Sequence, residues 1–441
     1  MSERVGFGTN FGFIMAAAGS AVGLGNIWKF PYITGEYGGG AFVLVYLGCI
    51  ALVGLPLMYA ELIIGRRGGS DVMGSLRKLI GQTPAGRGLA GATGLLAVAS
   101  GFLILSFYSV VAGWAIHFLV VSLGIIPMAE GGAEPTFGAV AGSPGWSALW
   151  HTIFMALVVG TVCVGVQKGI ERICRTIMPA LVGILCLLFV YVGVTGGLGE
   201  SLAFLFKPDF SKLTGDAVLE ALGHAFFTLS LGMGAMITYG SYLGDDRHVV
   251  RDGIAVAFLD TVIALLAGAV IFAVVFNGDG TPGAGPGLVF VTLPNLFQSM
   301  PGGTVLAVAF FVLLIFAAWS SGISLLEVVV AWLVDTWKLP RLGASLGAGG
   351  LIWLLGLSAA KWGAVIDALD NVTTKYMLPG GGLLVAIAAG YLLSREDRNA
   401  GFAHMPNGAL LASGFSFLIR YVTPFLVLAV ILAKIGLLSL G

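Results

Sequence analysis

Two apolar segments of this chain are interrupted near their middles by stretches rich in glycine. Residues 19–26 read Gly-Ser-Ala-Val-Gly-Leu-Gly-Asn, and residues 230–234 read Ser-Leu-Gly-Met-Gly. Glycine weakens a helix, and every backbone N–H or C=O group that is freed within lipid needs a partner. The half-helix ends at such a break offer N–H groups to an anion and carbonyl oxygens to a cation. The two stretches therefore predict a site for ions and a charged small molecule inside a membrane.

Polar side chains within other apolar runs support this prediction. Asp260 lies in the run 254–276, where a carboxylate is costly unless it meets a cation. Ser320 and Ser321 are adjacent; such hydroxyls either bond to preceding carbonyls of their own helix or ligate a hard cation, and the sequence leaves this open. We expect the intramembrane carboxylates Glu61 and Glu327 to be hydrogen-bonding partners of the broken helices.

The composition is that of a polytopic helical membrane protein. The chain has 441 residues, of which 58% are hydrophobic and 10% charged, whereas soluble domains carry about 25% charged residues. The 22 basic and 22 acidic residues give no net charge, so no nucleic-acid partner is expected. Scattered histidines and the lack of a Walker A motif argue against an enzyme or a nucleotide-driven pump. No filter-like repeat indicates a channel.

The hydropathy pattern predicts eleven spans within one transmembrane domain, 1–441. A broken helix opens each half of the chain, which is typical of two inverted repeats, here 10–196 and 217–393, with 411–438 as an additional span. The run 288–297 is too short to span, and we expect a lid or re-entrant hairpin there. The predicted spans are 10–33, 40–64, 90–123, 148–166, 172–196, 217–243, 250–276, 304–336, 342–360, 368–393 and 411–438.

The positive charges lie mainly in the loops on one side of the predicted membrane. This asymmetry predicts a cytoplasmic N-terminus and an external C-terminus in the cell's inner (plasma) membrane. The cationic residues predicted outside are few: Lys207, Lys212 and Lys361.

The motifs at 19–32, 38–42 and 226–235 resemble the neurotransmitter:sodium symporter family, in particular its bacterial amino-acid transporters. The resemblance covers nearly the whole chain. It implies an all-α polytopic membrane protein with the LeuT-type fold, in which spans 1–5 and 6–10 are inverted five-helix repeats and spans 1 and 6 are broken. It also implies sodium as the co-transported ion, with two sodium ions per cycle, and a small-molecule amino-acid substrate.

The resemblance places two sodium sites on this sequence. The first takes the carbonyl of Ala21, the side chain of Asn26, Thr228 and Asp260. The second takes three carbonyls and two hydroxyls, those of Gly19, Val22, Ala317, Ser320 and Ser321. Animal members bind chloride near the first site; because Asp260 already supplies a fixed charge and Ala264 replaces a polar residue, we expect transport without chloride.

The substrate is expected between the two breaks. Its carboxylate would meet the N–H groups of Leu24 and Gly25 and the hydroxyl of Tyr108, and Gly23 stands where amine-carrying relatives have Asp, so an α-amino acid is favoured over a monoamine. Room at Gly322 is expected to admit aromatic side chains. The complete predicted set is Ser20, Ala21, Leu24, Gly25, Ile104, Tyr108, Phe227, Thr228, Ser230, Met233, Gly322 and Leu325.

Two ion pairs are expected to act as gates. Lys29 and Asp370 match an outer pair that normally contains Arg, and Arg4 and Asp335 match an inner pair. Together these features predict sodium-coupled symport of a hydrophobic, aliphatic or aromatic, α-amino acid into the cell by alternating access. The alternative is a proton-coupled amino-acid carrier of the same fold, in which Asp260 titrates. We expect a lipid-embedded monomer or weak oligomer.

Overall fold

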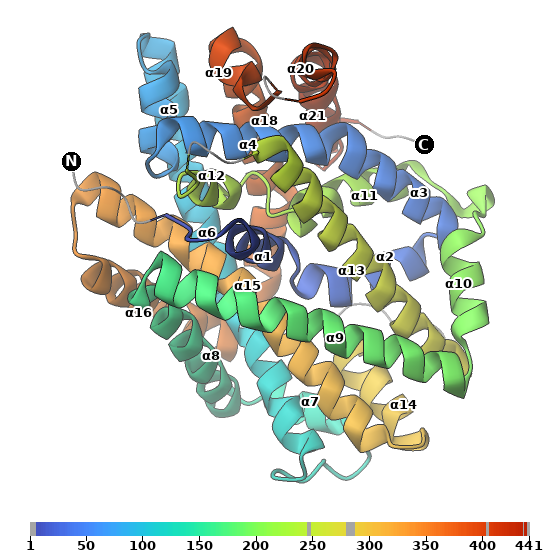
Figure 1. Ribbon diagram of the computed structural model, residues 1–441. Helices are drawn as coiled ribbons and strands as arrows, with labels where there is room; N and C mark the ends of the chain where they lie inside the picture. The colour runs from blue at the N-terminus through green and yellow to red at the C-terminus, as the bar shows by residue number, and fades with distance from the viewer. Residues whose placement is uncertain (1–5, 245–247, 279–286, 403–404, 435, 439–441) are drawn as a thin grey trace.

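The computed structural model describes residues 6–244, 248–278, 287–402, 405–434 and 436–438. These residues form helices and connecting turns without a β-strand; one isolated bridge joins Gly39 to Pro208. Figure 1 shows long helices that cross one another at various angles, with short helices such as α5 and α7 at opposite ends of the molecule.

The first predicted span is broken, as expected. Helix α1 (Asn10–Ala21) ends where Val22 adopts an extended conformation, with φ −72° and ψ 107°. The chain resumes as the π-helical segment η1 (Gly25–Lys29) and α2 (Phe30–Glu36), which run at 51° to α1. The bend exposes the last carbonyls of α1 and the first N–H groups of η1 to the centre of the molecule.

The other broken span consists of α11 (Gly215–Thr228) and α12 (Ala235–Gly240). Between them, Ser230, Gly232 and Gly234 have φ values of 53°, 78° and 76°. Two of the three left-handed positions are glycines, which adopt this conformation without a steric penalty. Glu61 stabilises this unwound segment because its Oε1 accepts from the N–H of Gly232 at 2.7 Å, which is the role expected for this carboxylate.

The rest of the two halves consists of α-helices and short π-helical or 3-10 segments that connect or continue them. In the first half they are α3 (Gly40–Cys49), η2 (Ile50–Gly54), α4 (Leu55–Gly68), α5 (Val72–Ile80), α6 (Pro84–Ser122), α7 (Ala133–Ala141), α8 (Pro144–Val164), η3 (Val166–Glu171), α9 (Arg172–Thr195), α10 (Leu198–Phe206) and η4 (Phe210–Lys212). In the second half they are α13 (Val249–Asn277), η5 (Leu288–Thr292), α14 (Leu293–Ser299), α15 (Gly303–Trp337), α16 (Arg341–Lys361), α17 (Gly363–Val372), η6 (Thr373–Met377), α18 (Leu378–Ile387) and η7 (Ala388–Leu392). The chain ends with α19 (Arg395–Asn399), η8 (Ala400–Phe402), α20 (Gly408–Phe417), η9 (Leu418–Val422) and α21 (Thr423–Lys434).

Among the described residues, nine helices are long and apolar enough to span a membrane, and the bent pair α1 and α2 makes ten. The pair α11 and α12 occupies the remaining predicted span, 217–243. The run 288–297 is helical and too short to span; its buried side chains include Phe290 and Phe297.

Helix α1 lies in the centre of the molecule, where α9, α13 and α15 pack against it (Figure 1). Its residues 15–21 are all buried. Helix α6 packs along α15, and both long helices contribute residues to the break in α1, Tyr108 from α6 and Ser321 from α15. The fold thus places one unwound backbone segment among four long helices.

Candidate functional site

The break in α1 brings backbone oxygens together around one hydroxyl group. The Oγ of Ser321, on α15, lies 3.3 Å from the carbonyl oxygen of Gly19, 3.2 Å from that of Ser20 and 3.1 Å from that of Val22. One hydroxyl hydrogen serves at most one of these three acceptors well. The arrangement therefore has more oxygen lone pairs than donors, which suits a hard cation such as sodium.

Ser320 behaves differently from its neighbour. Its Oγ donates to carbonyls of its own helix, those of Phe316 at 3.0 Å and Ala317 at 3.1 Å. The Cβ of Ser320 nevertheless lies against α1, because a Cβ placed on Gly19 would be 2.9 Å from it. The structure thus brings the residues predicted for the second sodium site to the contact between α1 and α15.

Three of the four residues predicted for the first sodium site are in direct contact. Nδ2 of Asn26 donates to Oδ1 of Asp260 at 2.7 Å and to Oγ1 of Thr228 at 3.0 Å. Oγ1 of Thr228 lies 3.1 and 3.0 Å from the two carboxylate oxygens of Asp260. Thr228 is 1% exposed and the other two side chains are fully buried. Ala21, the fourth, is the last residue of α1 and faces the central cavity.

A small central cavity lies between the two breaks. Its volume of about 20 Å³ corresponds to roughly one water molecule, so substrate entry requires its walls to move apart. Ten of the twelve predicted substrate residues line it, together with Gly23 and Ser321. The lining residues are Ser20, Ala21, Gly23, Leu24, Gly25, Ile104, Tyr108, Phe227, Ser230, Met233, Ser321 and Leu325.

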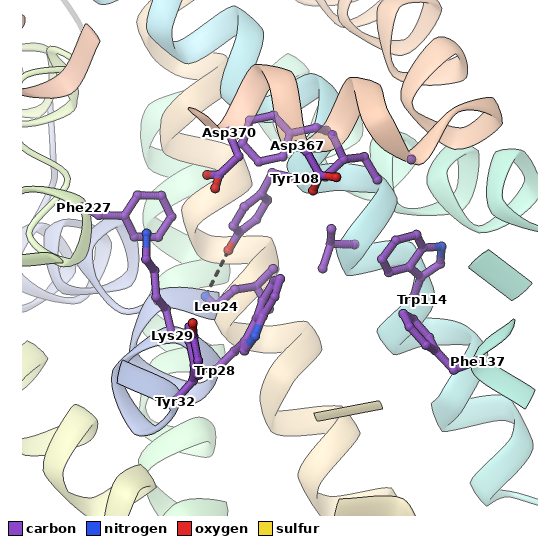
Figure 2. A pocket seen from close by; sticks show the side chains of 15 residues that line it. Leu24, Trp28, Lys29, Tyr32, Tyr108, Trp114, Phe137, Phe227, Asp367 and Asp370 are labelled. Atoms are coloured by element: carbon purple, nitrogen blue, oxygen red, sulfur yellow. Dashed lines mark hydrogen bonds between the residues drawn. The ribbon is translucent and has the colours of Figure 1, made fainter. Parts of the chain in front are cut away.

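The groups predicted to hold a substrate carboxylate are adjacent. The N–H of Leu24 donates to the hydroxyl of Tyr108 at 3.3 Å (Figure 2). Across the cavity, Oγ of Ser230 donates to the carbonyl of Ser20 at 2.7 Å, which joins the last turn of α1 to the unwound segment after α11. The hydroxyl of Ser20 in turn donates to Ser324 at 2.8 Å. A carboxylate placed here would meet the N–H of Leu24, in the break after α1, and the hydroxyl of Tyr108 on α6.

The structure differs from the prediction at Gly322. This residue does not line the central cavity: a Cβ on it would lie 3.0 Å from Val158 and 3.3 Å from Phe154, both on α8. Gly322 therefore allows α8 and α15 to pack closely, and it gives no extra room for a substrate. The twelfth predicted residue, Thr228, also lies outside the cavity lining and contacts Asp260 instead.

A larger vestibule opens beyond the central cavity. It has a volume of about 380 Å³ and shares Leu24, Gly25, Tyr108 and Phe227 with the smaller cavity. Figure 2 shows Lys29 and Tyr32 on one side and Asp367 and Asp370 of α17 on the other. The vestibule is lined by Leu24, Gly25, Trp28, Lys29, Tyr32, Phe107, Tyr108, Val111, Trp114, Phe137, Phe227, Gly363, Ile366, Asp367 and Asp370.

The predicted gate residues of the vestibule face the same space without touching. Nζ of Lys29 lies 5.4 Å from the ring centroid of Phe227. Within the described residues, no ion pair shorter than 4.0 Å joins Lys29 to Asp370. The access route from this side to Tyr108 is therefore open in this conformation.

The opposite side of the pathway is closed by the segment that precedes α1. Glu171 accepts hydrogen bonds from the N–H of Gly8 at 2.7 Å and from the hydroxyl of Thr9 at 2.7 Å. Phe7 packs edge-on against Tyr239 and Tyr242, and its N–H donates to the carbonyl of Tyr242 at 3.1 Å. Access is thus blocked on the side of α5.

Only one residue of the predicted inner gate lies among the described residues. Asp335 accepts from the N–H of Asp71 at 2.7 Å, and Arg4, its predicted partner, lies outside the described residues. Nearby, Arg341 forms a bidentate ion pair with the buried Glu327, with a shortest N–O distance of 2.5 Å. The hydroxyl of Tyr242 donates to the same carboxylate at 2.5 Å.

Sequence reasoning missed two residues of this closed side. No gate or site role was predicted for Glu171 or Arg341, because neither lies in a broken span; Arg341 counted only as one of the cytoplasmic positive charges. A signal existed for Arg341: Glu327 is an intramembrane carboxylate, and such a group needs a cation.

Comparison with known proteins agrees with this geometry. The family profile described as "Sodium:neurotransmitter symporter family" matches residues 4–133 and 140–439. The chain belongs to this family. Within the family it is 36% identical to the uncharacterized sodium-dependent transporter YhdH of Bacillus subtilis, over 100% of both chains. It is 29% identical to the sodium-dependent transporter MJ1319 of Methanocaldococcus jannaschii, over 97% of this chain and 90% of the relative.

A solved structure of the same family has a closely similar fold. The crystal structure of MhsT in complex with L-phenylalanine superposes with a TM-score of 0.89 and 40% sequence identity, over 98% of this chain and 100% of MhsT. This confirms the predicted LeuT-type fold. The symporter is a multi-pass membrane protein, and membership of this family identifies its activity as sodium-coupled symport.

Proposed function

We propose that this symporter takes up a hydrophobic α-amino acid, aliphatic or aromatic, by alternating access driven by sodium. The observation that carries the proposal is the convergence of both helix breaks on one cavity, with two oxygen-rich clusters next to the break in α1. The wall of that cavity is apolar at Ile104, Phe227, Met233 and Leu325, which favours substrates that bury apolar surface. The complex of MhsT with L-phenylalanine supports this substrate class.

The polar side of the cavity favours a zwitterion over a monoamine. Leu24 and Tyr108 offer donors to a carboxylate. A Cβ on Gly23 would lie 2.6 Å from Oγ of Ser321 and 3.1 Å from the hydroxyl of Tyr108, so the protein has no space there for an acidic side chain of its own. The ligand must therefore bring the carboxylate. The carbonyls freed in the unwound segment after Thr228 are suited to its amine.

We further propose that two sodium ions travel with the substrate and that chloride is not needed. The first ion would bind at Asn26, Thr228, Asp260 and the carbonyl of Ala21, and the second at Gly19, Val22, Ala317, Ser320 and Ser321. The carboxylate of Asp260 is fully buried and has no cationic partner within 4.0 Å among the described residues. A sodium ion next to it balances that charge without a bound anion.

The open vestibule and the closed opposite end suggest an outward-facing conformation. On this basis Lys29 and Asp370 form the outer gate, Asp335 belongs to the inner gate, and α5 and α19 face the cytoplasm. We place the N-terminus inside and the C-terminus outside the plasma membrane, with repeats at 10–196 and 217–393, an additional span at 411–438, and a monomeric or weakly associating state.

Transport into proteoliposomes tests this proposal. Sodium and proton gradients are imposed separately, and uptake of radiolabelled leucine, phenylalanine and a monoamine is compared, with chloride replaced by gluconate in one arm. We expect amino-acid uptake only with the sodium gradient and unchanged uptake in gluconate. Uptake driven by protons alone would support the proton-coupled alternative, and loss of uptake in gluconate would exclude chloride independence.

A further inference from the structure

Two arginine side chains meet at the end of the molecule formed by η7, α19 and η9 without an acidic partner. Nη1 of Arg398 donates to the carbonyl of Gly390 at 3.2 Å, and Nε of Arg420 donates to the same oxygen at 2.6 Å. Arg398 is 4% exposed and Arg420 is half-buried. Among the described residues, no carboxylate lies within 4.0 Å of either guanidinium.

The local structure explains why the two arginines converge. The span that contains η7 ends at Leu392, so the carbonyl of Gly390 has no helical partner further along the chain. A Cβ on Gly390 would lie 3.2 Å from Cγ of Arg420, so glycine allows η9 to come this close. Tyr59 holds Arg398 in place, because its hydroxyl donates to the Arg398 carbonyl at 2.9 Å.

The charges at this point are not balanced. A helix C-terminus carries about half a negative charge, whereas the two guanidinium groups carry two positive charges. Burial, with the nearby charges of Arg420 and Arg395, lowers the pKa of Arg398. Asp397 does not neutralise the pair, because it forms an ion pair with Arg67 at 2.6 Å.

Donor atoms also remain unused. Nε of Arg398 is buried and has no hydrogen-bond partner in the part of the chain that the structure describes. The terminal nitrogens Nη1 and Nη2 of Arg420 likewise make no hydrogen bond or ion pair to described residues. Guanidinium groups bind phosphate with short, charge-assisted hydrogen bonds, often two at a time. The terminal nitrogens of Arg420 therefore suit a phosphate group, and the guanidinium of Arg398 adds a second positive charge beside them.

The surface beside this cluster is apolar and aromatic. Tyr391, Phe417 and Tyr421 are 54%, 57% and 60% exposed, and the rings of Phe417 and Tyr421 lie 5.6 Å apart. Leu410 on α20 is 73% exposed. Exposed tyrosines of this kind are typical of the membrane interface, and basic pockets between spans on the cytoplasmic side hold anionic lipid headgroups.

We propose that Arg398 and Arg420 form a binding site for the phosphate of an anionic glycerophospholipid, whose acyl chains lie along Phe417, Tyr421 and Leu410. The site belongs to the leaflet next to α19, which is the side that we place in the cytoplasm. It lies at the end of the span Gly363–Leu392 opposite Asp370, and it does not depend on which amino acid is transported.

Native mass spectrometry of the purified protein tests the site. Phosphatidylglycerol or phosphatidylcholine is added in detergent, and retained lipid is counted for the wild type, Arg420→Gln, Arg398→Gln and Arg77→Gln. Arg77 is an exposed arginine on α5, on the same side of the membrane, and serves as the matched control. We expect each site substitution to weaken phosphatidylglycerol retention by about fivefold, the usual effect of one arginine near an anionic membrane surface, and Arg77→Gln to leave it unchanged.

Arg420→Lys gives a second test that preserves the positive charge. Lysine lacks the planar fork of donors that arginine offers. Arg420→Lys should therefore retain less phosphatidylglycerol than Arg77→Gln and more than Arg420→Gln. Three results would overturn the proposal: equal retention by the Arg420 variants and the control, equal retention of the two lipids by the wild type, or arginine-dependent binding of inorganic phosphate without retention of phosphatidylglycerol.

Discussion

The two candidate sodium sites lie close to the same break in α1 but are built from different chemistry. The second site consists of backbone carbonyls and the hydroxyls of Ser320 and Ser321, all of them neutral groups. The first site includes the carboxylate of Asp260, fully buried beside Asn26 and Thr228. As proposed, one site would bind a cation through dipoles alone, whereas the other also contains a fixed charge.

This difference indicates what each ion does for the protein. A buried carboxylate without a cation is costly, so filling the first site relieves a charge imbalance. The second site gains no such relief, and its affinity depends on how well the carbonyls of α1 are held against Ser321. Because these carbonyls are held only while α1 and α15 stay in contact, we expect occupancy of the second site to depend on conformation.

Removing the carboxylate of Asp260 should have the largest effect on sodium-dependent binding. Asp260→Asn leaves the ion without its counter-charge inside the protein, and we expect sodium-dependent substrate binding to weaken by about 100-fold or more. Scintillation proximity binding across a sodium titration measures this. Asp209→Asn, on an exposed loop, is the control for loss of one negative charge. Equal sodium affinity in the two variants would show that Asp260 is not a ligand.

Substitutions of Ser320 and Ser321 test whether a hydroxyl binds sodium or only bonds to its own helix. Ser321→Ala leaves three carbonyls of α1 without their shared donor and removes one oxygen, and we expect about a tenfold loss in sodium activation. Ser320→Ala should cost less, because that hydroxyl bonds to its own helix. The same sodium titration measures both variants. The reverse order would mean that binding rearranges α15 rather than α1.

Tyr108→Phe should weaken substrate binding and leave the sodium affinity unchanged. The variant removes a charge-assisted hydrogen bond to the substrate carboxylate, which corresponds to about a tenfold loss in amino-acid affinity. Competition binding at saturating sodium measures the loss, and sodium affinity serves as the internal control. A parallel shift in sodium affinity would argue that Tyr108 positions the break through Leu24 instead.

Gly322→Ala should have the smallest effect on transport, and it tests the corrected position of this residue. The new methyl group would press on Val158 and Phe154, so we expect a lower unfolding temperature. The ratio of alanine to phenylalanine uptake should stay unchanged. A selective loss of phenylalanine uptake would place Gly322 back in the substrate pocket.

The breaks, the spans and most of the cavity wall could be predicted from the sequence. Paired glycine-rich interruptions have few structural explanations inside lipid, and the resemblance to the symporter family indicated which residues of the other helices face the cavity. The grouping of Asp260 with Asn26 followed from the resemblance to the symporter family, whereas the apolar run alone predicted only that this carboxylate needs a cation.

Three features could not be predicted because they depend on how helices pack. The direction in which Gly322 faces is set by the rotation of α15 against α8, which the apolar sequence does not encode locally. The hydrogen bonds that Glu171 accepts from Gly8 and Thr9 join residues far apart in the chain. The convergence of Arg398 and Arg420 on Gly390 requires two π-helical segments to meet.

The central claim is that the paired breaks bind an amino acid and sodium together. The most direct test measures equilibrium binding of radiolabelled leucine and phenylalanine to the purified protein in sodium and in potassium at equal ionic strength. We predict saturable binding in sodium and no specific binding in potassium. Equal binding in the two salts would contradict the claim.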